Sequence, residues 1–202
     1  MALVLALSGC TKSGTEQKAA VPDEKKSFRL GETSPVQTST MRKHSGATFT
    51  ITPTEVKTGT KADIDNSGLK KAKEDGSQIP VYVRMTLTHK SGAPMEIGDM
   101  DNNVIVRTDK GHRARALIIL LGKAQWPDCP APDLEKMLKP GQSENMCNAF
   151  LIPEGHKAAA VEITQGYYKE PLEWQVDSDH AASSQSSAAP SAPQTVARDP
   201  SA

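Results

Sequence analysis

The chain has 202 residues, which is enough for one domain of ordinary size with a tail at each end. Lysine plus arginine and aspartate plus glutamate each number 24, so the formal net charge is zero. This balance argues against a nucleic-acid partner, which would require a basic surface. Beyond the N-terminal segment the longest apolar run, residues 116–121, is far too short to span a membrane.

The first ten residues combine an apolar run with a cysteine that follows two small residues. The run ends in Leu7-Ser8-Gly9-Cys10, and a polar segment begins at Thr11. This order resembles a bacterial lipobox, in which the cysteine thiol takes the lipid. The segment lacks a basic start and is short for a signal, so we expect the true start to lie upstream. We predict a truncated signal peptide over residues 1–10 and lipidation of Cys10; the alternative is a chance cysteine behind an apolar N-terminus.

Residues 11–27 are polar, with too little apolar content to fold alone, and we predict that they form a flexible tether. The folded domain is predicted to cover residues 28–177. Residues 178–202 are rich in serine, alanine and proline, and this composition predicts a disordered tail. The lipid anchor would then hold the domain at the extracytoplasmic face of the cell membrane.

Within the domain the dominant hydrophobic period is two, which indicates β-strands with one buried face. In the clearest example, residues 81–88, valine, methionine and leucine alternate with Tyr82, Arg84 and two threonines. The same reasoning predicts strands at residues 48–52, 104–106, 149–152, 161–164 and 172–176, with an ambiguous strand at 114–121. Glycine, proline, asparagine and aspartate separate these segments, so we predict an all-β fold of the antiparallel sandwich type.

Helical signals are weak. Residues 133–138 are compatible with one or two helical turns, because an aspartate opens the segment and Pro140-Gly141 closes it. Residues 99–103, which read Asp-Met-Asp-Asn-Asn, are predicted to form a turn between two strands.

One segment has the spacing of an EF-hand calcium loop. If Asp63 is counted as position one, Asp65 and Ser67 fall at positions three and five, a glycine at six and Glu74 at twelve. Lysines occupy positions eight and nine, and no amphipathic helix is predicted on either side. We therefore interpret the segment as an exposed hairpin loop and keep calcium binding as the alternative; no other cofactor is predicted.

The two cysteines of the domain, Cys129 and Cys147, are predicted to form a disulfide. An even pair in an exported protein favours this pairing, and a buried pair of free thiols is the alternative. Neither cysteine has the close cysteine or histidine neighbour that a zinc or blue-copper site requires.

Two further groups are less specific. His89, Met95 and Met100 offer soft ligands for copper, but methionine is more often core filling. A basic patch is made of residues that surround one predicted turn. It would suit anionic headgroups or cell-wall polymers, and a charged strand edge that blocks aggregation explains it equally well. Its members are Lys110, His112, Arg113 and Arg115.

Several structural motifs lie along the domain. They are Phe28-Arg29-Leu30-Gly31-Glu32-Thr33, the strand at 81–88 running into His89-Lys90-Ser91-Gly92, the segments at 138–143 and 150–155, and Trp174. Together they resemble the telokin-like immunoglobulin-fold domains of bacterial surface lipoproteins. The resemblance implies an immunoglobulin-like β-sandwich with an extracytoplasmic interaction role. The long polar insert at 58–77 and His89, where that family usually has a polar amide, depart from the pattern.

No nucleophile elbow, phosphate-binding glycine loop or active-site cysteine context is present in the sequence, so we predict that the protein is not an enzyme. The expected function is a binding or interaction module at the cell envelope, with the membrane and an unknown protein or cell-wall component as partners. The alternative is a calcium-binding lipoprotein that uses residues 63–74.

Overall fold

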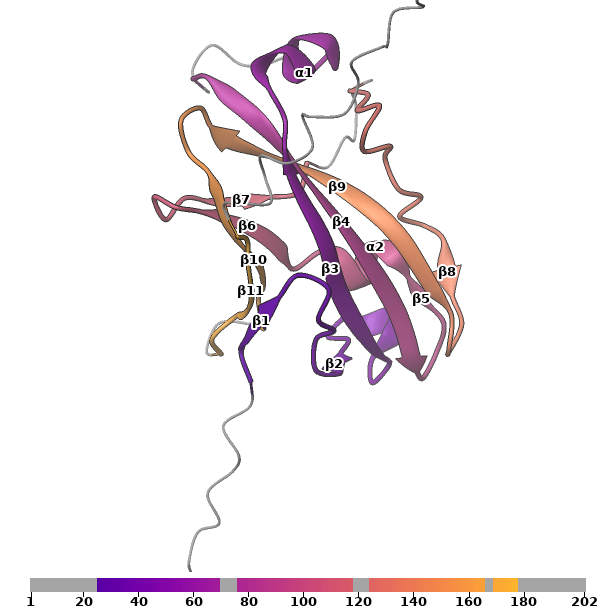
Figure 1. Ribbon diagram of the computed structural model, residues 1–202. Coiled ribbons are helices and arrows are strands. Elements are labelled where there is room, and N and C mark those ends of the chain that lie inside the picture. Colours follow the sequence, from indigo (N-terminus) through magenta and orange to yellow (C-terminus); the bar gives the residue numbers. More distant parts are fainter. Residues whose placement is uncertain (1–24, 70–75, 118–123, 166–168, 178–202) are drawn as a thin grey trace, which may run out of the picture.

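Two β-sheets enclose one hydrophobic core in the computed structural model, which describes residues 25–69, 76–117, 124–165 and 169–177 (Figure 1). The first sheet has the strand order β2-β3-β4-β9 and the second the order β1-β11-β10-β6-β7. The all-β sandwich predicted from the sequence is therefore confirmed.

The first sheet consists of three long antiparallel strands and one short strand. Its members are β2 (Gln37–Thr38), β3 (Thr48–Thr58), β4 (Gln78–Ser91) and β9 (Ser143–Pro153). The central strand β4 pairs with both long neighbours, so that Leu87 lies opposite Ile51 and Met85 lies opposite Met146. These three paired strands form the longest continuous part of the sheet, and the loops connect to their ends.

The second sheet has shorter strands. They are β1 (Ser27–Arg29), β6 (Val104–Thr108), β7 (Arg113–Arg115), β10 (Ala158–Ile163) and β11 (Leu172–Gln175). All neighbours in it run antiparallel except β1 and β11, which are parallel. The first strand begins at Ser27, one residue before the predicted start of the domain. The predicted strand at 114–121 is described only to residue 117, and β7 covers its beginning.

The core follows the alternation in the sequence. Val81, Val83, Met85 and Leu87 of β4 are buried between the sheets, as predicted. Trp174 of β11 is fully buried, and its indole Nε1 donates a hydrogen bond of 2.8 Å to a main-chain carbonyl. A buried indole with a satisfied N–H contributes large apolar area without an unpaired donor, which explains how it anchors the second sheet.

A second, smaller hydrophobic cluster covers the outer face of the first sheet. It consists of Ile64, Tyr82, Ala124, Trp126, Cys129, Cys147 and Ala149. Tyr82 was expected on a polar face, but the helix α1 (Lys61–Asn66) and the chain around residue 126 lie over it. Burial raises the pKa of the Tyr82 hydroxyl to about 12. The first sheet is therefore buried on both faces over part of its area.

Two predictions of local structure were wrong: the turn at residues 99–103, which begins as a helix, and the helical turns at 133–138. A five-residue helix, α2 (Ile97–Asp101), replaces the expected turn, because Ile97 and Met100 are three residues apart and both reach the core. The expected helix at 133–138 is instead a turn followed by β8 (Met137–Leu138), which pairs with β5 (Met95–Glu96). Burial of Leu138 in the core outweighs a weak helix signal.

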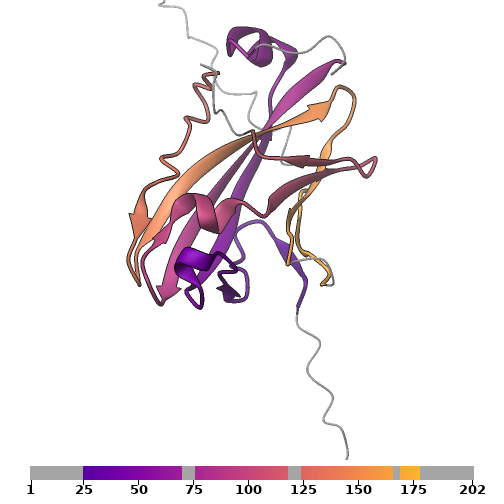
Figure 2. The same cartoon turned by 180° about the vertical axis from the view of Figure 1, so that it is seen from behind.

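Figure 2, which shows the molecule from behind, places α2 and the short 3-10 helix η1 (Arg42–His44) at the same end of the sandwich, near β2. The helix α1 lies at the opposite end (Figure 1). Among the described residues, no helix is long and apolar enough to cross a membrane. Cys10 and the predicted signal, most of the tether and the tail at 178–202 lie outside the described residues.

Candidate functional site

The predicted disulfide is present. Cys129 and Cys147 are bonded to each other, with their Cα atoms 5.3 Å apart, and both are buried. Cys147 belongs to the strand β9, whereas Cys129 lies in the connection that leads to β8. The bond therefore fixes an irregular segment of chain against the outer face of the first sheet.

Beside this disulfide the structure has a pocket of about 290 Å³. Both half-cystines contribute to its wall, and so does the exposed side chain of Leu134. A concave site with a largely apolar lining is the usual form of a small-molecule pocket. The other apolar lining residues are Ala116, Leu117, Trp126, Ala131, Pro132 and Ala149.

Two buried polar side chains lie in the same wall. Asn148 Nδ2 donates a hydrogen bond of 2.7 Å to Asp101 Oδ2, and both residues are buried. Burial raises the pKa of the Asp101 carboxyl to about 6, although the bond from Asn148 acts in the opposite direction. Trp126 adds a third polar group, since its Nε1 is buried without a hydrogen-bond partner among the described residues. The pocket thus combines apolar walls with a donor and a carboxyl of unusual basicity.

The segment proposed from its calcium-loop spacing adopts a different structure. Asp63 lies in α1 and completes a capping box, because its Oδ2 accepts a hydrogen bond of 2.6 Å from the main-chain N–H of Thr60. Asp65 forms an ion pair of 2.9 Å with Lys61. The Ser67 hydroxyl donates to the Ile64 carbonyl at 2.7 Å.

Glu74, the fourth predicted ligand, lies outside the described residues. Among the described ones, Asp63, Asp65 and Ser67 each have a local partner and belong to no cluster of metal-binding side chains. The interpretation of residues 63–68 as an ordinary exposed loop was wrong. A helix with an N-cap forms there, because Ile64 buries its side chain against the sheet.

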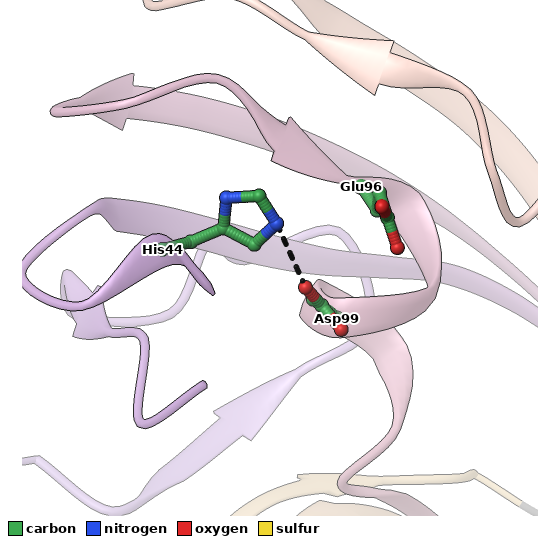
Figure 3. A group of neighbouring side chains, drawn as sticks. All are labelled: His44, Glu96 and Asp99. Carbon is green, nitrogen blue, oxygen red and sulfur yellow. Dashed lines mark ion pairs between the residues drawn. The ribbon is translucent and has the colours of Figure 1, made fainter. Parts of the chain in front are cut away.

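A cluster that the sequence analysis did not identify lies at the other end of the sandwich. It contains His44 at the end of η1, Glu96 at the end of β5 and Asp99 in the first turn of α2 (Figure 3). His44 Nε2 lies 3.1 Å from Asp99 Oδ2, and the three ligand atoms lie within 4.8 Å of one another. One feature of the sequence could have indicated this cluster: Glu96 and Asp99 are three residues apart, and side chains at positions i and i+3 face the same side of a helical turn.

The candidate copper ligands His89, Met95 and Met100 are core residues. Met95 and Met100 belong to the main hydrophobic cluster. His89 is fully buried, and its Nε2 forms a hydrogen bond of 3.0 Å with the Ser91 carbonyl. Each of the three therefore has a structural role without a metal.

The basic patch is partly neutralised. Arg113 of β7 forms an ion pair of 2.6 Å with Glu162, which also binds Arg107 at 2.7 Å. Lys110 Nζ donates to a main-chain carbonyl at 3.1 Å. Because β7 is the last strand of its sheet, these charges lie along an exposed edge, where they discourage pairing with another chain. The geometry favours the structural interpretation of this patch over a headgroup site.

Comparison with known proteins gives distant likenesses only. No family model matches the chain, and no curated protein sequence matches it significantly. The secreted protein MPT63 of Mycobacterium tuberculosis is similar in structure, with a TM-score of 0.49 and 14% identity over 74% of this chain and 96% of that one. A conserved hypothetical protein of Bacillus anthracis follows, with a TM-score of 0.37 and 17% identity over 68% and 96%. Neither likeness is strong enough to carry a functional argument.

Proposed function

We propose that this protein is a lipid-anchored binding module outside the cytoplasm, and that its pocket beside the Cys129–Cys147 disulfide binds a small apolar ligand. The observation that carries the proposal is the pocket itself, in which apolar walls meet three buried polar side chains. The disulfide supports export, because such bonds persist in oxidising compartments. The lipobox at Cys10 supports the anchor.

The chemistry of the wall defines the ligand class. A volume of about 290 Å³ is at the small end of ligand pockets, so it suits a compact molecule. The unpaired indole N–H of Trp126 favours a ligand with a hydrogen-bond acceptor, since a buried donor without a partner is unfavourable. We assign the pocket a binding role, because its walls are largely apolar and two of its polar side chains, Asp101 and Asn148, are buried.

The two tryptophans allow a direct test by NMR. Trp126 lines the pocket, whereas Trp174 is buried between the sheets with its N–H already bonded to a carbonyl. A screen of small apolar compounds that carry an acceptor should shift the indole N–H signal of Trp126 and leave that of Trp174 in place. A screen in which no compound moves the Trp126 signal of the folded protein would contradict the proposal.

A matched pair of variants tests the location of the site. Leu134 and Met137 are both exposed, at 38% and 45%, but only Leu134 lines the pocket. Leu134→Lys should lower the affinity of the protein for any ligand found in the screen at least about 10-fold, because it places a charge beside the apolar part of that ligand. Met137→Lys should leave its affinity unchanged. Equal effects of the two substitutions would place the ligand elsewhere.

A further inference from the structure

We propose that His44, Glu96 and Asp99 form a binding site for a divalent first-row transition metal, for which zinc is the experimental probe. The proposal starts from a buried nitrogen that makes no hydrogen bond. The His44 side chain is only 8% exposed, its Nε2 accepts or donates no hydrogen bond of good geometry, and it points at the two carboxylates (Figure 3). Asp99 Oδ2 is likewise buried without a hydrogen bond. The two atoms are close enough for an ion pair, but neither has a hydrogen bond of good geometry, and a metal ion bound by both would satisfy them.

The distances suit a metal ion. Ligands about 2.0–2.1 Å from a tetrahedral centre lie about 3.3 Å from one another. His44 Nε2 and Asp99 Oδ2 are 3.1 Å apart, close to that edge length. One ligand atom from each of the three residues, Glu96 included, lies within 4.8 Å of the other two, and the Glu96 side chain is partly exposed.

The backbone that holds the three ligands is fixed by hydrogen bonds. The main chain of His44 donates to Met41 at 3.1 Å and accepts from Ala47 at 3.0 Å. The start of α2 is tied to the chain before β8, because Ile97 N–H donates to the Lys136 carbonyl at 3.0 Å. Ligands on a rigid frame lose little freedom when a metal binds, which favours affinity.

A close approach of two turns positions His44 further. Gly92 has a φ of +98°, and a Cβ atom there would lie 2.7 Å from the Cα of Ala47. Only glycine permits the end of β4 to pack this tightly against the segment that follows His44. The loop that carries the histidine is thus held against the sheet.

The donor set selects the class of metal. One imidazole nitrogen with two carboxylates suits zinc, manganese or cobalt, whereas calcium and magnesium prefer oxygen donors alone. Three protein ligands leave one coordination position for water or an exogenous group. Asp99 also lines a cavity of about 440 Å³ beside β2, so one of the three ligand residues borders open space.

The competing explanation is a histidine–aspartate ion pair without a metal. Lys43 lies 3.8 Å from the Glu96 carboxylate, and it can move into solvent because its side chain is 76% exposed. An ion pair predicts no affinity for zinc, so metal titration separates the two explanations.

The experiment uses the full chain with Cys10→Ser, so that no free thiol competes for the metal. After treatment with EDTA, zinc is titrated calorimetrically and the melting temperature is followed. We expect one equivalent to bind and to raise the melting temperature. Asp99→Asn and Glu96→Gln should each lower the affinity for zinc at least about 10-fold. Loss of a residue that only supports a ligand already lowers metal affinity by about that factor. Glu96→Gln covers the case in which the buried Asp99 variant fails to fold.

His112→Ala is the matched control, because the rings of His112 and His156 lie close together, with centroids 6.2 Å apart, and offer zinc a competing pair of nitrogens away from the proposed site. Zinc binding that persists in His112→Ala and weakens in both carboxylate variants supports the site. Absence of binding, binding lost in His112→Ala, or binding unchanged in Glu96→Gln would each overturn it.

Discussion

Asp101 provides the sharpest test of the physical reasoning about the pocket. Its carboxyl is buried, receives one hydrogen bond from Asn148 and has a pKa raised to about 6 by burial. In the unfolded chain the same group has a pKa near 3.8. The folded state therefore binds the proton more tightly, so ionisation of Asp101 destabilises the fold.

The magnitude follows from the difference between the two pKa values. About 2.2 units at 1.36 kcal/mol each correspond to about 3 kcal/mol at neutral pH. Below pH 3.8 both states are protonated and the penalty is absent; it grows between pH 3.8 and pH 6 and is constant above. Asp101→Asn keeps the shape of the side chain and an acceptor for Asn148 but carries no charge. We expect the variant's free energy of unfolding to be about 1–3 kcal/mol higher than that of the wild type at pH 7.

Urea denaturation of the wild type and the variant at half-unit steps from pH 4 to pH 8 measures this directly. The stability difference between them should rise with pH up to about 6 and then level off. Asp177→Asn, at an exposed position, serves as the control and should show no such rise. A stability difference that does not depend on pH, or a variant less stable than the wild type at pH 7, would refute the conclusion that burial disfavours ionisation of the Asp101 carboxyl.

Three further outcomes are expected. Replacing both Cys129 and Cys147 by alanine should lower the free energy of unfolding by about 3 kcal/mol, because the bond closes a loop of 18 residues; a loss under about 1 kcal/mol in urea denaturation would argue against it. Glu162→Gln should lower the free energy of unfolding by about 1–3 kcal/mol, since Glu162 is 4% exposed between two arginines. Glu170→Gln, at an exposed ion pair, should have a clearly smaller effect, and equal losses would contradict this account. Calcium should leave the melting temperature of the EDTA-treated protein unchanged, because the described oxygen ligands in residues 63–67 have local partners. A calcium-dependent shift in melting temperature would support residues 63–74 as a calcium site.

The sandwich could be predicted from the sequence because its signal is local. The alternation in β4 alone assigns four core residues, and each of them is buried between the sheets. Tyr82 in the same strand was misassigned, because the cover supplied by α1 and the chain around Trp126 depends on contacts that alternation does not encode.

The candidate sites depend on contacts between distant parts of the sequence. Asp101 and Asn148 are 47 positions apart, and His44 meets Asp99 only because η1 and α2 converge at one end of the fold. Such convergence is a property of the topology rather than of any short motif. The disulfide was predictable without it, since the domain contains only two cysteines.

Top-down mass spectrometry of the protein recovered from a bacterium that expresses its complete coding sequence tests the central claim most directly. We predict a membrane-bound species in which Cys10 is the first residue and carries a diacylglycerol, while Cys129 and Cys147 are oxidised to the disulfide. An unmodified chain with free thiols in the cytosolic fraction would contradict the account of a lipid-anchored, extracytoplasmic binding module.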